Sequence, residues 1–169
     1  MSTIRPARTT DVFAMVALLR DQYARSRYVG RVNIDDKYAR SLLAQMIQRH
    51  GGTHAGATLV NVVETGEGVI CGFCAGLLDR VHMIGDRLVA QDIFLVIDEA
   101  SGSRGSMRLL SQYFQWAEAI PAVLEITLSH TDAIPDGERV GQFYERLGFV
   151  RCGALYRRDT AKRGEALAA

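Results

Sequence analysis

Tyr144 has the chemistry and the position of a side chain that donates a proton. It lies in the segment 143–149, near the end of a predicted helix, and Gly148 suits the left-handed residue that often ends a helix. A phenol has a reference pKa of about 10, so at pH 7 it is neutral and able to donate. Aromatic side chains on an apolar helix face are usually core residues, and we interpret Phe143 in that way. A buried tyrosine hydroxyl, however, still needs a polar partner, which makes Tyr144 our candidate general acid.

Two further titratable residues are candidates for a general base. Asp92 interrupts the otherwise apolar run 88–97, where a buried carboxylate costs free energy unless it is paired or used. It is either a base or the partner of an arginine in a structural ion pair, and the sequence leaves both interpretations open. His130 follows the next predicted strand and has a pKa suited to proton transfer. A histidine at a strand end is more often structural, so His130 ranks behind Asp92.

A loop rich in glycine and serine stands between the apolar run and the next predicted helix. Such a turn leaves backbone N–H groups free at the helix N-terminus, where the helix dipole favours negative charge. It therefore predicts an anion site, with a plain flexible connection as the simpler alternative. The residues of this loop are Ser101, Gly102, Ser103, Arg104, Gly105 and Ser106.

The apolar periodicity predicts the elements that hold these residues. Helical spacing follows Asp11, Asp35 and Met107 and recurs over 140–147. The order β-α-α-β-β-β-α-β-α-β predicts an α/β fold in which a mixed sheet is flanked by helices on both faces. We expect one domain over 1–159 and a frayed tail over 160–169. The predicted strands are 2–7, 57–64, 69–78, 88–97, 122–129 and 149–157.

Composition excludes several classes of protein. The 169 residues are 48% hydrophobic and carry a net charge of +1, which makes nucleic acid an unlikely partner. No apolar run approaches the ~20 residues of a membrane span, and the N-terminus lacks the apolar core of a signal peptide, so a cytoplasmic location is predicted. Cys71 and Cys74 lie within a predicted strand, and no second pair completes a zinc set. We therefore expect buried thiols and no metal.

The segment 143–149, which reads FYERLGF, resembles the C-terminal motif of the GNAT (Gcn5-related N-acetyltransferase) superfamily, written YEKLGF. The predicted order of elements is similar to that fold over nearly the whole chain. The resemblance implies that Tyr144 protonates the departing thiolate of coenzyme A. It also implies that an acidic residue of the strand before the loop, here Asp92, acts as the base directly or through water. The amide that stabilises the oxyanion in this family falls near Leu95 and Val96.

The segment 96–102 resembles the family pattern V-x-P-E-x-R-G, after which a turn wraps the pyrophosphate of acetyl-CoA with backbone amides. Ser101 stands where the family has Arg or Gln, Arg104 at the first glycine and Ser106 at the last small position. Arg104 either crowds the phosphates or pairs with them as a charged donor. In an alternative alignment of this loop with the family pattern, Gly102 and Gly105 are the functional glycines.

The resemblance predicts an acetyl-CoA-dependent N-acetyltransferase that modifies a primary amine of a small acceptor, with acetyl-CoA as co-substrate. A homodimer is possible because the family often forms one. The alternatives are a non-catalytic module that binds acyl-CoA or another protein, and an acetyltransferase that acts on a protein amine. The connection between the first two helices either lines the acceptor pocket or is a solvated face. Its candidate residues are Tyr23, Arg25, Arg27, Tyr28 and Arg31.

Overall fold

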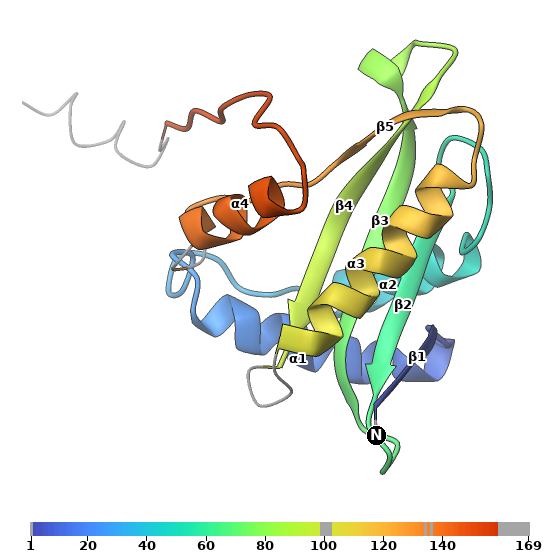
Figure 1. The fold of residues 1–169 in the computed structure, drawn as a ribbon. Helices are drawn as coiled ribbons and strands as arrows, with labels where there is room; N and C mark the ends of the chain where they lie inside the picture. The colour runs from blue at the N-terminus through green and yellow to red at the C-terminus, as the bar shows by residue number, and fades with distance from the viewer. Residues whose placement is uncertain (1, 99–102, 134, 136, 159–169) are drawn as a thin grey trace, which may run out of the picture.

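The computed structural model describes residues 2–98, 103–133, 135 and 137–158 (Figure 1). The described residues form five strands and four α-helices, which follow the predicted order except for its last strand, with two short 3-10 turns at Thr9–Asp11 and Val81–Met83. The elements are β1 (Thr3–Pro6), α1 (Val12–Ala24), α2 (Asp36–Gln48), β2 (Thr58–Glu64), β3 (Ile70–Arg80), β4 (Leu88–Ile97), α3 (Ser103–Glu118), β5 (Val123–Thr127) and α4 (Gly137–Arg146).

The strands form a single mixed sheet in the order β1-β2-β3-β4-β5. The first four strands are antiparallel to their neighbours, while β5 adds to β4 in parallel after the crossover through α3. Hydrogen bonds join Thr65 to Val69 across the turn between β2 and β3, where Gly68 has a φ of +82°. A backbone with positive φ favours glycine, which explains this residue at the predicted hairpin.

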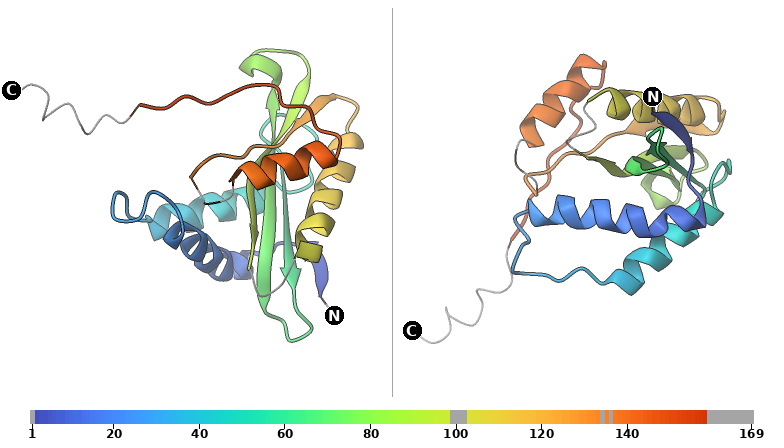
Figure 2. Two further views of the ribbon diagram at one scale, coloured as in Figure 1. Left: turned by 60° about the vertical axis from the view of Figure 1, so that its left-hand side comes forward. Right: turned by 90° about the horizontal axis from the view of Figure 1, so that it is seen from below.

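Helices cover both faces of the sheet, as predicted. The two views of Figure 2 show α1 and α2 against one face and α3 and α4 against the other. Each face has its own apolar core, in which a fully buried leucine contributes roughly 1.5–3 kcal/mol. The α1/α2 core contains Met15, Val16, Leu43, Val60, Val62 and Phe73. The α3/α4 core contains Leu78, Ala90, Leu109, Leu110, Tyr113 and Tyr144.

Helix α4 ends as the sequence predicts, with Gly148 at a φ of +93°. The Gly148 N–H donates to Glu145 O at 3.0 Å, and the Phe149 N–H donates to Tyr144 O at 3.1 Å. These two bonds form a Schellman motif, which normally brings apolar residues at its two ends together. The rings of Tyr144 and Phe149 do meet here, with centroids 6.4 Å apart. The motif therefore places Tyr144 on the buried side of α4.

The prediction of a last strand over 149–157 is wrong. Residues 150–158 are exposed and pair with no strand in the described part of the chain. Exposed ion pairs join the segment to its surroundings, between Arg151 and Glu138 at 2.7 Å and between Arg157 and Asp132 at 2.6 Å. A strand exists only where its backbone pairs with a neighbour, and local residue preferences do not encode that long-range contact.

The predicted loop over 101–106 is also too long, because α3 already begins at Ser103. Cys71 and Cys74 are buried free thiols, as expected. None of the helices described here has the length and apolar character needed to cross a membrane. Among the same described residues, no group of three or more His, Cys, Asp and Glu side chains is placed to hold a metal ion.

Candidate functional site

Strands β4 and β5 separate near the middle of β4, and we call this point the fork. The parallel ladder runs from the pair Leu88 and Val123 to the pair Gln91 and Thr127. Beyond it β5 ends, while β4 continues to Ile97 with β3 as its only described partner. One edge of β4 is therefore open from Asp92 onward, with backbone polar groups that need a partner.

A β-bulge marks the start of the open half of β4. Asp92 is opposite Gly76 and Phe94 is opposite Ala75, so Ile93 is the extra residue on the bulged strand. A bulge bends its strand and redirects the side chains on either side of it, and such irregularities are enriched next to active sites. The Ile93 side chain is 40% exposed.

Asp92 lies at the fork and accepts hydrogen bonds across it. Its Oδ1 accepts from the Ser129 N–H at 2.9 Å and from the Ser129 hydroxyl at 3.1 Å. No arginine or lysine among the described residues pairs with it, so the structure does not contain the predicted alternative of an ion pair. Burial raises the pKa of Asp92, and the two bonds from Ser129 only partly oppose this effect. A carboxylate with a raised pKa is a stronger base.

Tyr144 lies on α4 within the electrostatic reach of Asp92. The tyrosine is 6% exposed, and its hydroxyl bonds to none of the described residues. Burial raises the pKa of this phenol, and the negative charges of Asp92 and then Cys74 raise it further. Tyr144 is therefore protonated at neutral pH. The structure thus brings the predicted acid and the preferred base candidate to the same region.

His130 packs against α4 one turn before Tyr144. A Cβ atom placed on Gly141 would lie only 2.4 Å from His130 Nε2, so the imidazole rests directly on the helix backbone. Gly141 is buried and has no side chain to hold the ring away. The predicted alternative base therefore also borders the site, but it faces the helix that carries the acid. Glu125 and Glu145 are exposed.

The two predicted backbone donors on β4 point in opposite directions. The Asp98 N–H donates to Cys71 O on β3 at 2.8 Å. In an antiparallel ladder the N–H groups of successive residues alternate between the two edges of the strand. Val96, two residues earlier, therefore faces β3, where it is paired with Phe73. The N–H of Leu95 faces the open edge at the fork and is the better placed of the two candidates.

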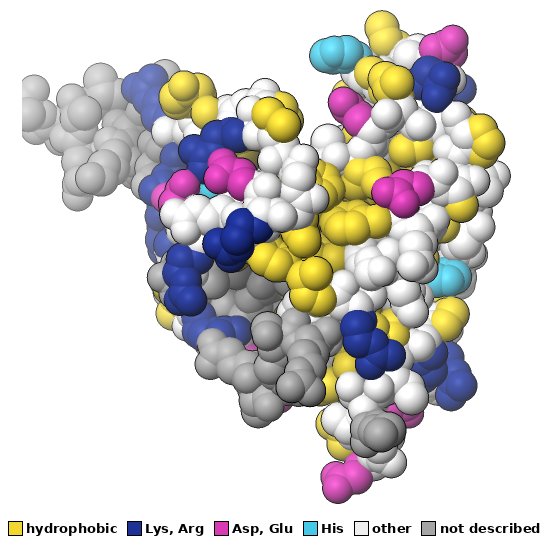
Figure 3. All heavy atoms as spheres, viewed as in Figure 1, with side chains coloured by type: hydrophobic (Ala, Val, Ile, Leu, Met, Phe, Trp, Pro, Cys, Tyr) yellow, Lys and Arg dark blue, Asp and Glu magenta, His cyan; other side chains and the backbone are white. Residues whose placement is uncertain are grey.

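A hollow of about 530 Å³ lies between the start of α3 and α4. In Figure 3 apolar side chains gather between these two helices, and positively charged side chains lie along the α4 side. The hollow thus joins an apolar floor to a basic rim, close to the N-terminus of α3. Its lining residues are Ser106, Met107, Pro135, Arg139, Val140, Gln142, Phe143 and Arg146.

Only residues 103–106 of the predicted anion loop lie within the described part of the chain. Ser101 and Gly102 lie outside the described residues. Ser103 and Arg104 form the first turn of α3. Gly105 packs at ordinary contact distance, since a Cβ atom there would lie 3.5 Å from Ile97 Cδ1. Among the described residues of this loop, Ser106 lines the hollow between α3 and α4.

A second hollow of about 300 Å³ lies on the other side of β4, against α1. Arg25 is the only predicted acceptor residue that lines it. Tyr23 instead donates to the backbone oxygen of Tyr28 at 2.8 Å, and Arg27 pairs with Asp132 at 3.2 Å. These two side chains hold the connection between α1 and α2 in place. The lining residues are Leu18, Asp21, Ala24, Arg25, Val96, Ile97 and Asp98.

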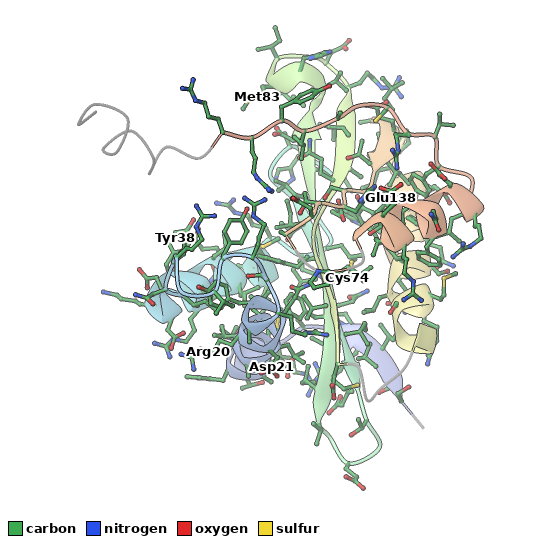
Figure 4. The ribbon with its side chains drawn as sticks, turned by 90° about the vertical axis from the view of Figure 1, so that its left-hand side faces the viewer. Arg20, Asp21, Tyr38, Cys74, Met83 and Glu138 are labelled. Atoms are coloured by element: carbon green, nitrogen blue, oxygen red, sulfur yellow. The ribbon has the colours of Figure 1, made fainter. Side chains whose placement is uncertain are left out.

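The positions of the two hollows follow from the layers of the fold. Figure 4 shows Cys74 on the sheet, with Asp21 of α1 on one side and Glu138 of α4 on the other. The end of β4 lines the hollow against α1, whereas the hollow on the other side of the sheet is lined by α3, α4 and Pro135. Sequence reasoning missed Ser129 and the bulge at Ile93, because both depend on how β4 meets its neighbours. Gly76, in the middle of a strand, was the available signal for the bulge.

Comparison with known proteins supports the fold. No protein-family profile and no characterised protein sequence matches this chain. Among solved structures, a predicted acetyltransferase with acetyl-CoA from Clostridium acetobutylicum matches at a TM-score of 0.69 and 16% identity, over 96% of this chain and 99% of that one. A ribosomal-protein-alanine N-acetyltransferase from Brucella melitensis biovar Abortus matches at 0.64 and 17%, over 94% and 98%. A transcriptional regulator from Bacillus halodurans matches at 0.69 and 20%, over 94% and 99%.

The protein has the fold of the GNAT acetyltransferases, which confirms the fold expected from the sequence. At these identities the likeness concerns the fold, and similar folds carry different functions. The activity must therefore be argued from the residues at the fork.

Proposed function

We propose that the protein is an acetyl-CoA-dependent N-acetyltransferase that acts on a primary amine of a small acceptor. The observation that carries this proposal is the fork, where a carboxylate lies at an open strand edge within the electrostatic reach of a buried phenol. Acetyl-CoA supplies the activated thioester. The chain must supply a base for the amine, an acid for the leaving thiolate and donors that hold the thioester.

Asp92 is the base in this proposal. A free alkylammonium has a pKa of ~10.4, so about one molecule in 2,500 is nucleophilic at pH 7, a cost of roughly 4.6 kcal/mol. A carboxylate with a raised pKa and one oxygen held by Ser129 can take the amine proton. The amine nitrogen loses a proton to Asp92 as it attacks the thioester carbon, directly or through water.

Tyr144 is the acid in this proposal. Its hydroxyl is protonated at neutral pH and belongs to no described hydrogen bond, so it is available to give its proton to the departing sulfur. The Leu95 N–H faces the open edge of β4, where it can donate to the thioester oxygen as negative charge develops there. These three groups lie on β4 and α4, on two sides of the fork.

The hollow between α3 and α4 suits the rest of acetyl-CoA. The N–H groups in the first turn of α3, which have no partner within the helix, and the basic side chains Arg139 and Arg146 favour the phosphates. The apolar floor with Met107 and Phe143 favours the pantetheine arm. The hollow against α1 is then left for the acceptor, and its mixed charges, Asp21, Arg25 and Asp98, fit a small polar amine.

A second candidate function is a non-catalytic module that binds acyl-CoA. It is favoured by the structural likeness to a protein described as a transcriptional regulator. The likeness to a ribosomal-protein-alanine N-acetyltransferase similarly keeps a protein amine as an alternative acceptor. Both alternatives retain the hollow between α3 and α4 and differ in what reaches Asp92.

An acceptor screen separates these functions. Thiol release from acetyl-CoA is followed with small amines, amino acids and peptides with free N-termini. The proposal expects turnover with at least one small amine. Release only with peptides would transfer the activity to a protein acceptor. Acetyl-CoA binding without release for any acceptor would contradict catalysis and favour the module.

A further inference from the structure

Tyr113 is a buried titratable residue that the proposed mechanism does not use. It lies on the sheet-facing side of α3 with Leu109, Leu110 and Ala117, all 0% exposed. Its hydroxyl is enclosed, yet it has no hydrogen-bond partner among the described protein atoms. A buried hydroxyl without a partner costs free energy, so such a group points to a partner other than the protein, such as a buried water.

The Tyr113 ring lies against Gly76, the residue of β3 that is opposite Asp92. A Cβ atom added to Gly76 would lie 2.4 Å from Tyr113 Cε2 and 2.8 Å from Cδ2, so the ring occupies the space that a side chain at Gly76 would fill. Gly76 is directly opposite Asp92 in the register of β3 and β4. Residues paired in this way point their side chains to the same face, with Cβ positions roughly 5 Å apart. Asp92 therefore points to the same face as the Tyr113 ring.

The Oδ2 atom of Asp92 is available for such a partner. Both bonds from Ser129 go to Oδ1, so Ser129 does not occupy Oδ2. The other titratable groups that face Asp92 are Cys74 on β3 and Tyr144 on α4. Burial raises the pKa of Cys74 to about 12, and the charge of Asp92 adds to this, as it does for Tyr113 and Tyr144. All three are therefore donors at neutral pH.

We propose that a buried water molecule bridges the Tyr113 hydroxyl and the Asp92 carboxylate, which makes Tyr113 a positioning residue. The water has the polar partners that buried waters require, with Tyr113 as a donor and Asp92 as an acceptor. Ser129 and the water hold the carboxylate from two sides, so that its orientation at the fork is set before any substrate binds. The role of that carboxylate as a base rests on the proposed function, whereas the bridge itself does not.

Titration of Asp92 tests the bridge without any substrate. Carbon-13 NMR of the Asp carboxyl groups, with the Asp92 signal assigned by Asp92→Asn, gives the pKa in the native chain and in Tyr113→Phe. Loss of a donor to the carboxylate destabilises its charged form, so we expect the Asp92 pKa to rise by about 0.5 unit or more. Ser129→Ala is the positive control, because it removes a donor that the structure shows. Tyr156→Phe, at an exposed tyrosine, is the matched negative control.

An unchanged Asp92 pKa in Tyr113→Phe, beside a raised value in Ser129→Ala, would overturn the bridge and leave the proposed function untouched. A crystal structure of the unmodified chain gives a second test that needs no variant. We expect one water within hydrogen-bond distance of both side chains, and a dry contact there would contradict the proposal. If the enzyme is active, the acid limb of kcat/KM should also move to higher pH in Tyr113→Phe, with the KM for acetyl-CoA unchanged.

Discussion

Two carboxylates in this protein are shielded from solvent but face different hydrogen-bond donors. Asp11 lies between β1 and α1, is 7% exposed and receives both Nη groups of Arg5, at 2.7 and 3.0 Å. The Arg8 N–H also donates to it at 2.7 Å. Asp92 lies at the fork and accepts hydrogen bonds from the N–H and the hydroxyl of Ser129, with no cation beside it among the described residues. One carboxylate faces a cation, and the other faces neutral donors.

The surroundings push the two pKa values apart. Burial alone raises the pKa of Asp11, but the hydrogen bonds from Arg5 and Arg8 outweigh it, and the net pKa is lowered. For Asp92 burial dominates, and the pKa is raised. A paired carboxylate stabilises the fold as a permanent anion. An unpaired one with a raised pKa is a stronger base, which is a property that a site can use. We therefore read Asp11 as structural and Asp92 as functional.

The same substitution at the two positions should give the sharpest contrast. Asp92→Asn keeps an oxygen for Ser129 but removes the base, so we expect turnover to fall by about 10³-fold. Acetyl-CoA affinity should be retained, because the hollow between α3 and α4 is untouched. Steady-state thiol release and calorimetry measure the two quantities. Turnover per folded molecule should not change in Asp11→Asn, and an equal loss there would erase the distinction.

Removal of the phenol at the fork should have the next largest effect. Tyr144→Phe retains the ring contacts with Phe149 and loses only the hydroxyl. We expect turnover to fall by about 10²-fold or more with little change in acetyl-CoA affinity. Tyr156→Phe makes the same chemical change at a side chain that is 95% exposed and should be silent. Full activity of Tyr144→Phe would remove this residue from the mechanism.

Asp11→Asn should lower the stability of the fold rather than the turnover. Asp11→Asn leaves Arg5 with Glu64 as its remaining partner at 2.5 Å. Because the Arg5 side chain is 18% exposed, we expect an intermediate loss of about 1–3 kcal/mol in the free energy of unfolding. Urea denaturation at neutral pH measures it. A neutral or stabilising result would show that the Arg5 and Asp11 pair does not support the fold.

The smallest expected effects concern the pH dependence of stability, which should differ between Asp11→Asn and Asp92→Asn. The lowered pKa of Asp11 gives stability that is present above the unfolded value of 3.8 and lost as the pH falls through the folded pKa. The raised pKa of Asp92 acts in the opposite direction, with stability present below 3.8 and lost as the pH rises through the folded pKa. Asp92→Asn should therefore gain stability relative to the native chain as the pH rises, while the deficit of Asp11→Asn should shrink in acid. Parallel curves would contradict the assignment.

The elements with strong local signals were predictable from the sequence. The apolar run at 88–97 coincides with β4, and Asp35 caps α2 by accepting from the Tyr38 N–H at 2.9 Å. The end of α4 at Gly148 follows from glycine alone. These features depend on spacing, capping and positive φ, all of which lie within a few residues along the chain.

Features that depend on distant pairing were not predictable. The strand expected over 149–157 needs a neighbouring edge, and the bulge at Ile93 appears only when β4 is laid against β3. The partner of Asp92 is Ser129, 37 residues away, rather than the arginine that the ion-pair interpretation requires. At the candidate site, residue types indicated Asp92 and Tyr144, while only the fold shows that Leu95, rather than Val96, faces the open edge.

Calorimetric titration with acetyl-CoA tests the central claim most directly, since every role at the fork presupposes a bound thioester. We predict saturable binding below millimolar concentration. Val140→Glu, in the hollow between α3 and α4, should weaken binding at least tenfold by adding negative charge beside the phosphates, a change of about 1.4 kcal/mol. The matched variant Val69→Glu, at an exposed position next to the turn between β2 and β3, should bind as the native chain does. No heat at millimolar acetyl-CoA, or equal binding by both variants, would contradict the account.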